Sequence, residues 1–160
     1  MTYTIEALKR EEEETALDGF DYTVVWRLGS LMREAAARGH KPVAIQITHG
    51  LDPIFLSVLP GATADNVEWI RRKTATAQRF HQSTLRLQLA SAAGGYDFNQ
   101  RYRLSESEFV AAGGAVPLFV HGAGMVGVAA VSGLPSTEDH EMVVEALKEL
   151  KRSSAIQQGN

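Results

Sequence analysis

Two strand–turn–strand patterns constrain the fold of this chain more than any other feature of its sequence. In residues 42–59, alternating apolar residues lie on both sides of a turn at 49–53. In residues 115–132, two apolar runs flank a glycine-rich turn at 121–124, and Gly127 indicates a close backbone approach or a bulge. Each pattern predicts a β-hairpin.

Apolar residues at helical spacing predict helices on either side of these hairpins. The expected helices cover residues 4–17, 21–38, 65–80 and 105–112, together with a final helix that has Ser136 as its N-cap. The intervening stretch 82–105 fits either a short helix or a strand over 83–89. Since the strands form hairpins rather than alternating with helices, we expect an α+β domain with an antiparallel sheet.

Length and composition indicate a single domain and exclude several classes of function. The chain has 160 residues, a net charge of −3 and no cysteine, which argues against nucleic-acid binding and excludes disulfides and thiolate sites. No apolar run reaches the length of a membrane span, and residues 1–14 do not resemble a signal peptide, so we expect a cytoplasmic protein without membrane contact. Residues 153–160 are polar and are expected to fray.

The predicted helix 65–80 carries a lysine where an apolar residue is expected. Asp65 and Glu68 have the spacing of a capping box at its start. Lys73 lies on the same arc as Ile70 and Ala77, and a buried, unpaired ammonium costs several kcal/mol. Lys73 is therefore expected to pair with a carboxylate or carbonyl groups, to extend to solvent, or to bind an anionic ligand in a pocket or interface.

Three histidines are further candidates for ligand binding. His81 is expected on the same arc as Lys73, either as a satisfied core or interface residue or as a ligand or acid–base group. His49 and His121 lie in the two hairpin turns. They are interpreted as exposed turn residues, which meet only if both turns lie at the same end of the sheet.

The loop before the final helix offers backbone N–H groups to an anion at Ser132 and Gly133. The nearby Glu138 and Asp139 already complement the helix dipole and repel an anion, so a capping role is preferred for Asp139. No paired carboxylates with a catalytic spacing, no metal motif and no nucleotide-binding motif are present.

Two charged patterns are interpreted mainly as solvated surface. The glutamates at 11–14 are expected to face water, with an acidic contact for a partner as the alternative. Arg72, Arg79 and Arg86 repeat about every seven residues and form either a solvated face paired with Glu68 or a contact for an acidic partner or subunit.

Several segments together resemble the haem-degrading-domain family (GlcG/HbpS-like), and in particular a short subfamily without an assigned function. The similar segments are GGAVPLFVHGAGMVGVAAVSGLPSTEDH at 113–140, DNVEWIRRKTATAQRF at 65–80, FDYTVVWRLGSLMREAA at 20–36 and PVAIQITHG at 42–50. They fall within residues 20–150. A lysine recurs in the family at Lys73, whereas a histidine that often precedes the double glycine is replaced by Ala112.

The resemblance implies a profilin-like α/β/α sandwich and assembly into homo-oligomers. It also allows haem as a ligand, although no histidine of this chain maps onto a haem ligand and the residues themselves assign no cofactor. We therefore expect a non-catalytic domain that binds a small anionic ligand or a protein partner near Lys73. The alternatives are a haem-binding or haem-degrading protein and an enzyme on small metabolites that uses Lys73 with His81 or His121.

Overall fold

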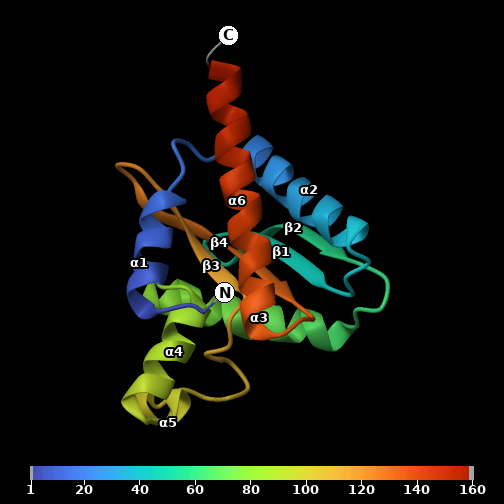
Figure 1. Ribbon diagram of the computed structural model, residues 1–160. Coiled ribbons are helices and arrows are strands. Elements are labelled where there is room, and N and C mark those ends of the chain that lie inside the picture. The colour runs from blue at the N-terminus through green and yellow to red at the C-terminus, as the bar shows by residue number, and fades with distance from the viewer. Residues whose placement is uncertain (1, 159–160) are drawn as a thin grey trace.

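A four-stranded antiparallel sheet forms the middle layer of the molecule (Figure 1). The computed structural model describes residues 2–158. The strand order is β2-β1-β4-β3, and every neighbouring pair is antiparallel. The strands are β1 (Ala44–His49), β2 (Asp52–Val58), β3 (Ala115–Val120) and β4 (Gly124–Ser132). The two hairpins and the antiparallel α+β sheet predicted from the sequence are confirmed.

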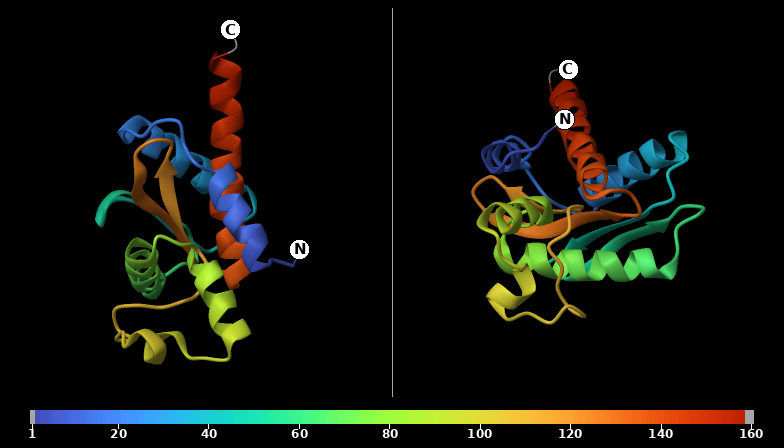
Figure 2. Two further views of the ribbon diagram at one scale, coloured as in Figure 1. Left: turned by 90° about the vertical axis from the view of Figure 1, so that its left-hand side faces the viewer. Right: turned by 60° about the horizontal axis from the view of Figure 1, so that its bottom comes forward.

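Helices cover both faces of this sheet. The right-hand view of Figure 2 shows α2 (Tyr22–Arg38) and α6 (Ser136–Gln158) on one face and α3 (Ala64–Phe80) on the other. The remaining helices, α1 (Ile5–Glu14), α4 (Thr84–Gly94) and α5 (Phe98–Tyr102), lie to one side and below (Figure 1). The result is the α/β/α sandwich that was expected.

The two layers between sheet and helices differ in the size of their side chains. On the α2 and α6 face, the core is built from large residues such as Leu28 and Ile45. Gly29 lets α2 approach the sheet, because a Cβ there would lie 2.5 Å from the ring of Phe55. On the other face the core is rich in alanine, including Ala44, Ala115 and Ala130, so α3 packs close to the strands.

The start and end of α3 differ from the sequence prediction. Thr63 is the N-cap residue and forms a capping box with Asn66, so Asp65 is already in the first turn. The helix ends at Phe80, and His81 follows in the left-handed conformation with φ of 54°. This reversal turns the chain away from the axis of α3 before α4 begins.

Three other segments also differ from expectation. Residues 82–105 form α4 and α5 rather than a strand. The helix predicted at 105–112 is absent from the structure, and this segment runs along α3 instead, with Val110 N donating to Thr76 Oγ1 at 3.0 Å. At the C-terminus, α6 continues through Gln158 instead of ending near Ser153. Residues 159–160 of the expected frayed tail lie outside the described residues.

Helix α1 is attached through its glutamates, which were expected to face water. The Oε1 atom of Glu11 forms a hydrogen bond with His140 Nε2, and the two atoms are 2.6 Å apart. Glu12 pairs with Arg86 Nη1 at 2.8 Å and accepts from Ser83 N at 3.0 Å. Two of the four residues of the acidic run therefore make internal contacts, because α1 packs against α4 and α6.

The sheet has two unlike edges. At the β3 edge, Leu17 makes a parallel bridge to Val120, with Leu17 N donating to Phe119 O at 2.7 Å and His121 N donating to Leu17 O at 2.9 Å. The other edge is β2, which pairs only with β1. Between these edges, a Cβ on Gly127 of β4 would collide with the Thr48 carbonyl oxygen, so the close approach expected at this glycine is confirmed.

Candidate functional site

A buried ion pair joins α3 to the start of α6. The Nζ atom of Lys73 lies 3.0 Å from Asp139 Oδ2 and donates to Val131 O at 3.2 Å. The Lys73 side chain is 4% exposed and that of Asp139 is 1% exposed. The expectation that Lys73 finds a carboxylate and a carbonyl group is therefore confirmed in its geometry.

Asp139 holds two segments together from the first turn of α6. Its Oδ2 atom meets Lys73, and its Oδ1 atom accepts a hydrogen bond from Leu134 N at 3.0 Å. The capping role expected for Asp139 is thus only half of its function, because the same carboxylate neutralises Lys73. It faces inward because Val143 and Leu147, one and two turns further along α6, are buried against the sheet.

The double glycine lets the backbone lie against this ion pair. Gly114 has φ of +135°, and a Cβ there would lie 2.5 Å from Val131 O and 2.8 Å from Lys73 Nζ. A Cβ on Gly113 would lie 2.7 Å from Ser136 O. Only glycine fits both positions, so the GG motif, Lys73 and Asp139 belong to one structural unit.

Burial opposes the charge on both members of the pair. Desolvation lowers the pKa of Lys73, and the Asp139 carboxylate partly offsets that effect. Desolvation likewise raises the pKa of Asp139, with Lys73 and the hydrogen bond from Leu134 acting in the opposite direction. The protonation states of Lys73 and Asp139 therefore depend on the charges and polar groups that lie beside the pair.

A pocket of about 350 Å³ opens beside the ion pair. Its walls come from α3, from Ala112 before the double glycine, and from the loop between β4 and α6. The lining residues are Asn66, Trp69, Lys73, Ala112, Ser132, Gly133, Leu134, Pro135, Ser136 and Asp139. Arg72 stacks on Trp69, with its guanidinium carbon 4.3 Å from the ring centroid, and so places a second cation next to one wall.

The structure brings three of the six candidate residues together and places the other three elsewhere. Lys73, Ser132 and Gly133 line the same pocket. His81 is exposed at the left-handed end of α3, and eight residues of helix separate it from Lys73 by roughly 12 Å along the axis. The expectation that His81 continues the buried arc of Lys73 is therefore wrong, because His81 follows the end of the helix and is exposed.

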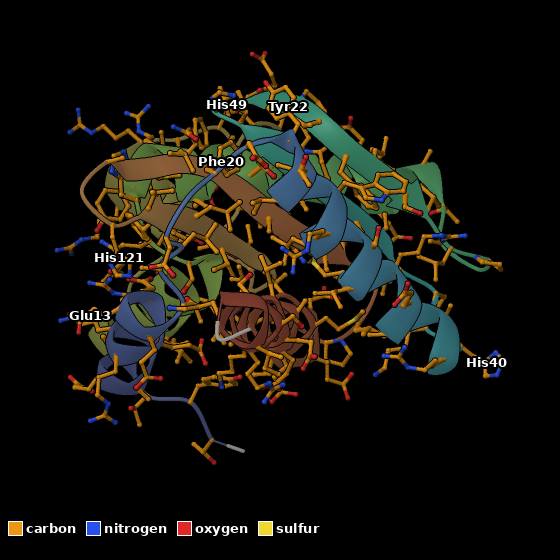
Figure 3. The ribbon with its side chains drawn as sticks, turned by 90° about the horizontal axis from the view of Figure 1, so that it is seen from above. Glu13, Phe20, Tyr22, His40, His49 and His121 are labelled. Carbon is orange, nitrogen blue, oxygen red and sulfur yellow. The ribbon has the colours of Figure 1, made fainter. Side chains whose placement is uncertain are left out.

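His49 and His121 are surface residues at the far end of the sheet (Figure 3). Both hairpin turns do lie at the same end, since β1 and β4 are antiparallel and His49 is in register with Gly127. The two histidines nevertheless have different neighbours: His49 Nδ1 is 3.1 Å from Tyr22 Oη, and His121 Nε2 is 3.9 Å from Asp18 Oδ1. The ion pair contacts β4 at Val131, near the opposite end of that strand.

Sequence reasoning missed His140, which is as buried as the residues of the core. Its side chain is 1% exposed, Nε2 contacts Glu11, and Nδ1 has no hydrogen-bond partner among the described residues. Tyr3 packs against the imidazole ring edge to face, with 5.2 Å between centroids. The signal was available, since His140 precedes Val144 and Leu147 by four and seven residues on the apolar stripe of α6.

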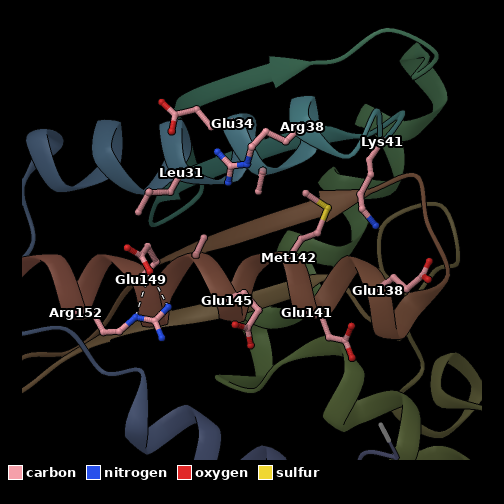
Figure 4. A pocket seen from close by; sticks show the side chains of 12 residues that line it. Leu31, Glu34, Arg38, Lys41, Glu138, Glu141, Met142, Glu145, Glu149 and Arg152 are labelled. Carbon is pink, nitrogen blue, oxygen red and sulfur yellow. Dashed lines mark hydrogen bonds and ion pairs between the residues drawn. The ribbon is translucent and has the colours of Figure 1, made fainter.

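Three further hollows are larger than the Lys73 pocket, and two of them carry charged groups or histidine beside apolar surface. A groove of about 560 Å³ between α2 and α6 has apolar residues such as Leu31 and Met142 and a row of glutamates along α6 (Figure 4). A hollow of about 600 Å³ beside the β3–β4 turn brings His121 together with Lys9, Arg86 and Phe119. Among the described residues, no group of three or more acidic or histidine side chains could hold a metal ion.

Comparison with known proteins identifies the family of the chain. A family model described as haem degrading protein HbpS-like matches residues 20–148. The chain belongs to the HbpS-like family. The UPF0303 protein of Streptomyces avermitilis is 41% identical to this HbpS-like chain over 146 residues, which cover 91% of this chain and 90% of the relative. The UPF0303 protein of Pseudomonas entomophila is 42% identical over 140 residues, covering 88% and 78%.

Solved structures share the fold of this HbpS-like chain. The structure of the Ybr137w protein superposes with a TM-score of 0.85 at 29% identity and covers 92% of this chain and 88% of its own. HbpS itself gives 0.64 at 19% identity, covering 82% and 89%. The complex of PduOC with heme gives 0.69 at 18% identity, covering 81% and 94%. Within the described residues, no helix has both the length and the apolar character needed to cross a membrane.

Proposed function

We propose that this HbpS-like chain is a cytoplasmic, homo-oligomeric binding domain that holds a small anionic ligand, such as a monocarboxylate, in the Lys73 pocket. The observation that carries the proposal is the buried Lys73–Asp139 pair at the wall of a pocket of about 350 Å³. Perturbed, buried titratable groups that border a pocket mark binding sites more often than ordinary surface does.

The charges around the pocket favour a ligand with a single negative charge. An ammonium group has three N–H donors, and Lys73 uses two of them on Asp139 and Val131. The third donor has no partner among the described residues, and Arg72, which stacks on the lining residue Trp69 without lining the pocket itself, raises the positive potential nearby. Asp139 repels a multiply charged anion at the same place, so the net balance suits a small carboxylate better than a polyphosphate.

A reaction is not part of this proposal. The enzyme alternative paired Lys73 with His81 or His121, but neither histidine lines the Lys73 pocket. His140 is adjacent to Asp139 in sequence, yet its Nε2 atom is directed at Glu11. General acid–base chemistry needs its groups within hydrogen-bond reach of a common substrate, and the described residues of the pocket do not provide such a pair besides Lys73 and Asp139 themselves.

Thermal unfolding with acetate, lactate, succinate and citrate tests the proposed ligand class. We expect at least one monocarboxylate to raise the Tm of the wild-type protein in a concentration-dependent way, because a ligand that binds only the folded state stabilises it. The double variant Lys73→Met/Asp139→Asn removes both charges and is expected to lose this shift. His81→Ala is the matched control and should keep it.

Two results contradict the proposed ligand class. One is a wild-type protein whose Tm none of the four carboxylates changes beyond the effect of equal ionic strength. The other is a double variant that responds as strongly as the wild type, which would place the binding elsewhere.

Haem binding is the second candidate function, and one observation favours a specific place for it. The Lys73 pocket does not fit haem, because its lining contains no histidine, methionine, cysteine or tyrosine as an axial ligand. The hollow beside the β3–β4 turn contains the kinds of group that haem needs: His121 offers an imidazole, Lys9 offers a cation for a propionate, and Phe119 offers apolar surface. Arg86 is a second cation there, but it is paired with Glu12, which lines the same hollow.

A haemin titration followed by the Soret band separates the two candidates. Specific binding in the β3–β4 hollow gives a saturable Soret shift that His121→Ala abolishes and His49→Ala leaves unchanged. A wild-type protein without a saturable shift removes haem as the ligand and leaves the Lys73 proposal unaffected.

A further inference from the structure

The exposed hydrophobic side chains of the molecule are concentrated near one edge of the sheet. Seven large hydrophobic residues are clearly exposed within the described chain, and five of them lie on α2, on β2 or in the turn before β2. These five are Tyr22, Trp26, Leu51, Leu56 and Val58, between 45% and 66% exposed. Leu56 and Val58 are in register with Gln46 and Ala44 and so lie on the α3 face, whereas Tyr22 and Trp26 lie on α2 over the other face. Exposed apolar side chains that gather on both faces of one sheet edge mark an interaction surface rather than ordinary solvent-exposed protein.

The backbone at this edge is available for pairing. Leu59 N donates to Val43 O at 2.9 Å, and Ser57 and Phe55 are in register with Ile45 and Ile47. Because antiparallel strands alternate between groups that face the neighbour and groups that face away, the N–H and C=O groups of Leu56 and Val58 point away from β1.

The second half of β2 lacks the devices that usually protect an edge strand. Natural edge strands carry lysines, prolines or bulges that prevent pairing with another chain. In β2 such devices stand only at the start, with Asp52, Pro53 and a bulge at Ile54, whereas residues 55–58 carry no charge, no proline and no bulge. This segment therefore has the sequence of an edge strand that another protein surface covers in the functional assembly.

We propose that β2 pairs with β2 of a second copy of this chain, antiparallel and about a two-fold axis at Leu56, so that two sheets join into one of eight strands. In that register Leu56 faces its own counterpart at the axis, and Val58 lies two residues away on the same face of each strand, so apolar residues meet at the centre of the joint. A self-complementary surface of this kind is what two-fold symmetry requires. The proposal specifies the oligomer that the proposed function assumes.

The adjoining surface of α2 carries a hollow and charges of both signs. A hollow of about 470 Å³ lies beside the strand and is lined by Trp26, Arg33, Glu34 and Leu56 among others. Arg33 and Glu34 carry opposite charges side by side, so two copies related by a two-fold axis attract rather than repel each other here.

The area is sufficient for a specific dimer. Aromatic side chains bury roughly 150–250 Å² each when covered, so the exposed parts of the five hydrophobic residues amount to about 500 Å² per copy. Two copies then bury about 1,000 Å² from these side chains alone, which reaches the lower limit for specific interfaces before the backbone of the paired strands is counted.

Sedimentation velocity of charge variants at Leu56 tests the pairing. We expect the wild-type protein to sediment as a dimer or a larger even assembly, and Leu56→Lys and Leu56→Glu each to sediment at half that mass because like charges face each other at the axis. An equimolar mixture of the two variants should regain the wild-type mass. Ile156→Lys changes an exposed hydrophobic residue on α6 and is the matched control, expected to assemble like the wild type.

The experiment distinguishes the interface from the ligand proposal. A monomeric wild type, or a Leu56→Lys variant that assembles normally, overturns the pairing. So does a pair of folded monomeric variants whose mixture stays monomeric, since that places another molecule on β2. Circular dichroism confirms that the variants fold, and Val58→Lys replaces Leu56→Lys if they do not. The carboxylate Tm shift in the Leu56 variants tests the Lys73 pocket independently.

Discussion

Lys73 shows how one residue that breaks a sequence pattern can mark the centre of a domain. Its ammonium is buried with Asp139, against the Val131 carbonyl and a glycine that leaves room for it. Four parts of the chain that are distant in sequence meet at this atom: α3, the double glycine, β4 and the first turn of α6. Replacing one partner therefore affects all of them.

Removing only the lysine should destabilise the protein strongly. In Lys73→Met the Asp139 carboxylate stays buried without its cation, and breaking a buried ion pair in this way costs about 3–5 kcal/mol. In the double variant Lys73→Met/Asp139→Asn no buried charge remains, and we expect a free energy of unfolding within about 1 kcal/mol of the wild type, or above it. Urea unfolding of the three proteins measures both values. Equal losses in the single and double variants would show that packing, and not charge, dominates.

The loss in Lys73→Met should depend on pH in a defined direction. Burial raises the pKa of Asp139 above its ordinary value of 3.8, and removing Lys73 takes away a group that lowers it. The penalty is therefore complete above the folded-state pKa and shrinks as pH falls through that pKa toward 3.8, below which the carboxyl group is protonated in both states. The difference in unfolding free energy between wild type and Lys73→Met should shrink between pH 7 and pH 4. A constant difference over this range would mean that Asp139 does not titrate there.

At the scale of elements, α1 is the part held most by polar contacts. Leu8 is its buried residue, and it is otherwise joined to the body by Glu11 and Glu12. Lys151 of α6 also donates to the carbonyl groups of Glu14 and Ala16 at 2.8 Å each. An element with little apolar burial is expected to open before the rest of the molecule.

Truncating Glu11 should loosen α1 without unfolding the sheet. Glu11→Ala leaves His140 buried without its one hydrogen-bond partner, which costs about 1–3 kcal/mol. Glu13→Ala alters an exposed neighbour and is expected to change stability by less than about 0.5 kcal/mol. Hydrogen exchange followed by mass spectrometry should show faster exchange in residues 5–14 of the first variant only. Equal exchange in both variants would mean that the Glu11–His140 contact does not hold the helix.

Elements with strong periodicity could be predicted from the sequence, and those set by distant contacts could not. The two hairpins and α2 follow directly from alternation and helical spacing. The helix predicted at 105–112 fails because Val110 is held by Thr76 on α3, a contact that local propensity does not contain. The end of α3 could be placed only approximately, because the left-handed conformation at His81 has no signal such as a glycine.

Only one member of the ion pair at the candidate site could be predicted from the sequence. Lys73 stands out because a charge on an apolar arc requires an explanation. Its partner, 66 residues away, was hidden because Asp139 also fits the pattern of a helix cap. Extending the apolar stripe of α6 backward from Val143 by one turn would have placed Asp139 inside, which is the signal that was overlooked.

At the scale of the whole molecule, the two ends of the sheet have different surroundings. The ion pair and its pocket lie near the last residues of β4, whereas both hairpin turns, with His49 and His121, lie at the other end. The two candidate ligand sites are therefore separated by the length of the sheet. Occupying one leaves the other open, and the proposed strand pairing at β2 uses an edge that neither pocket needs.

The short bridge from Leu17 to Val120 sets how far such an assembly can grow. It occupies the outer side of β3, and Pro117 in that strand has no N–H to donate. In the proposed assembly each molecule therefore has one edge strand, β2, that pairs with a second copy, and one edge strand, β3, whose outer side is occupied by Leu17. Addition along the sheet stops after a single step, and the result is a finite pair instead of a fibre.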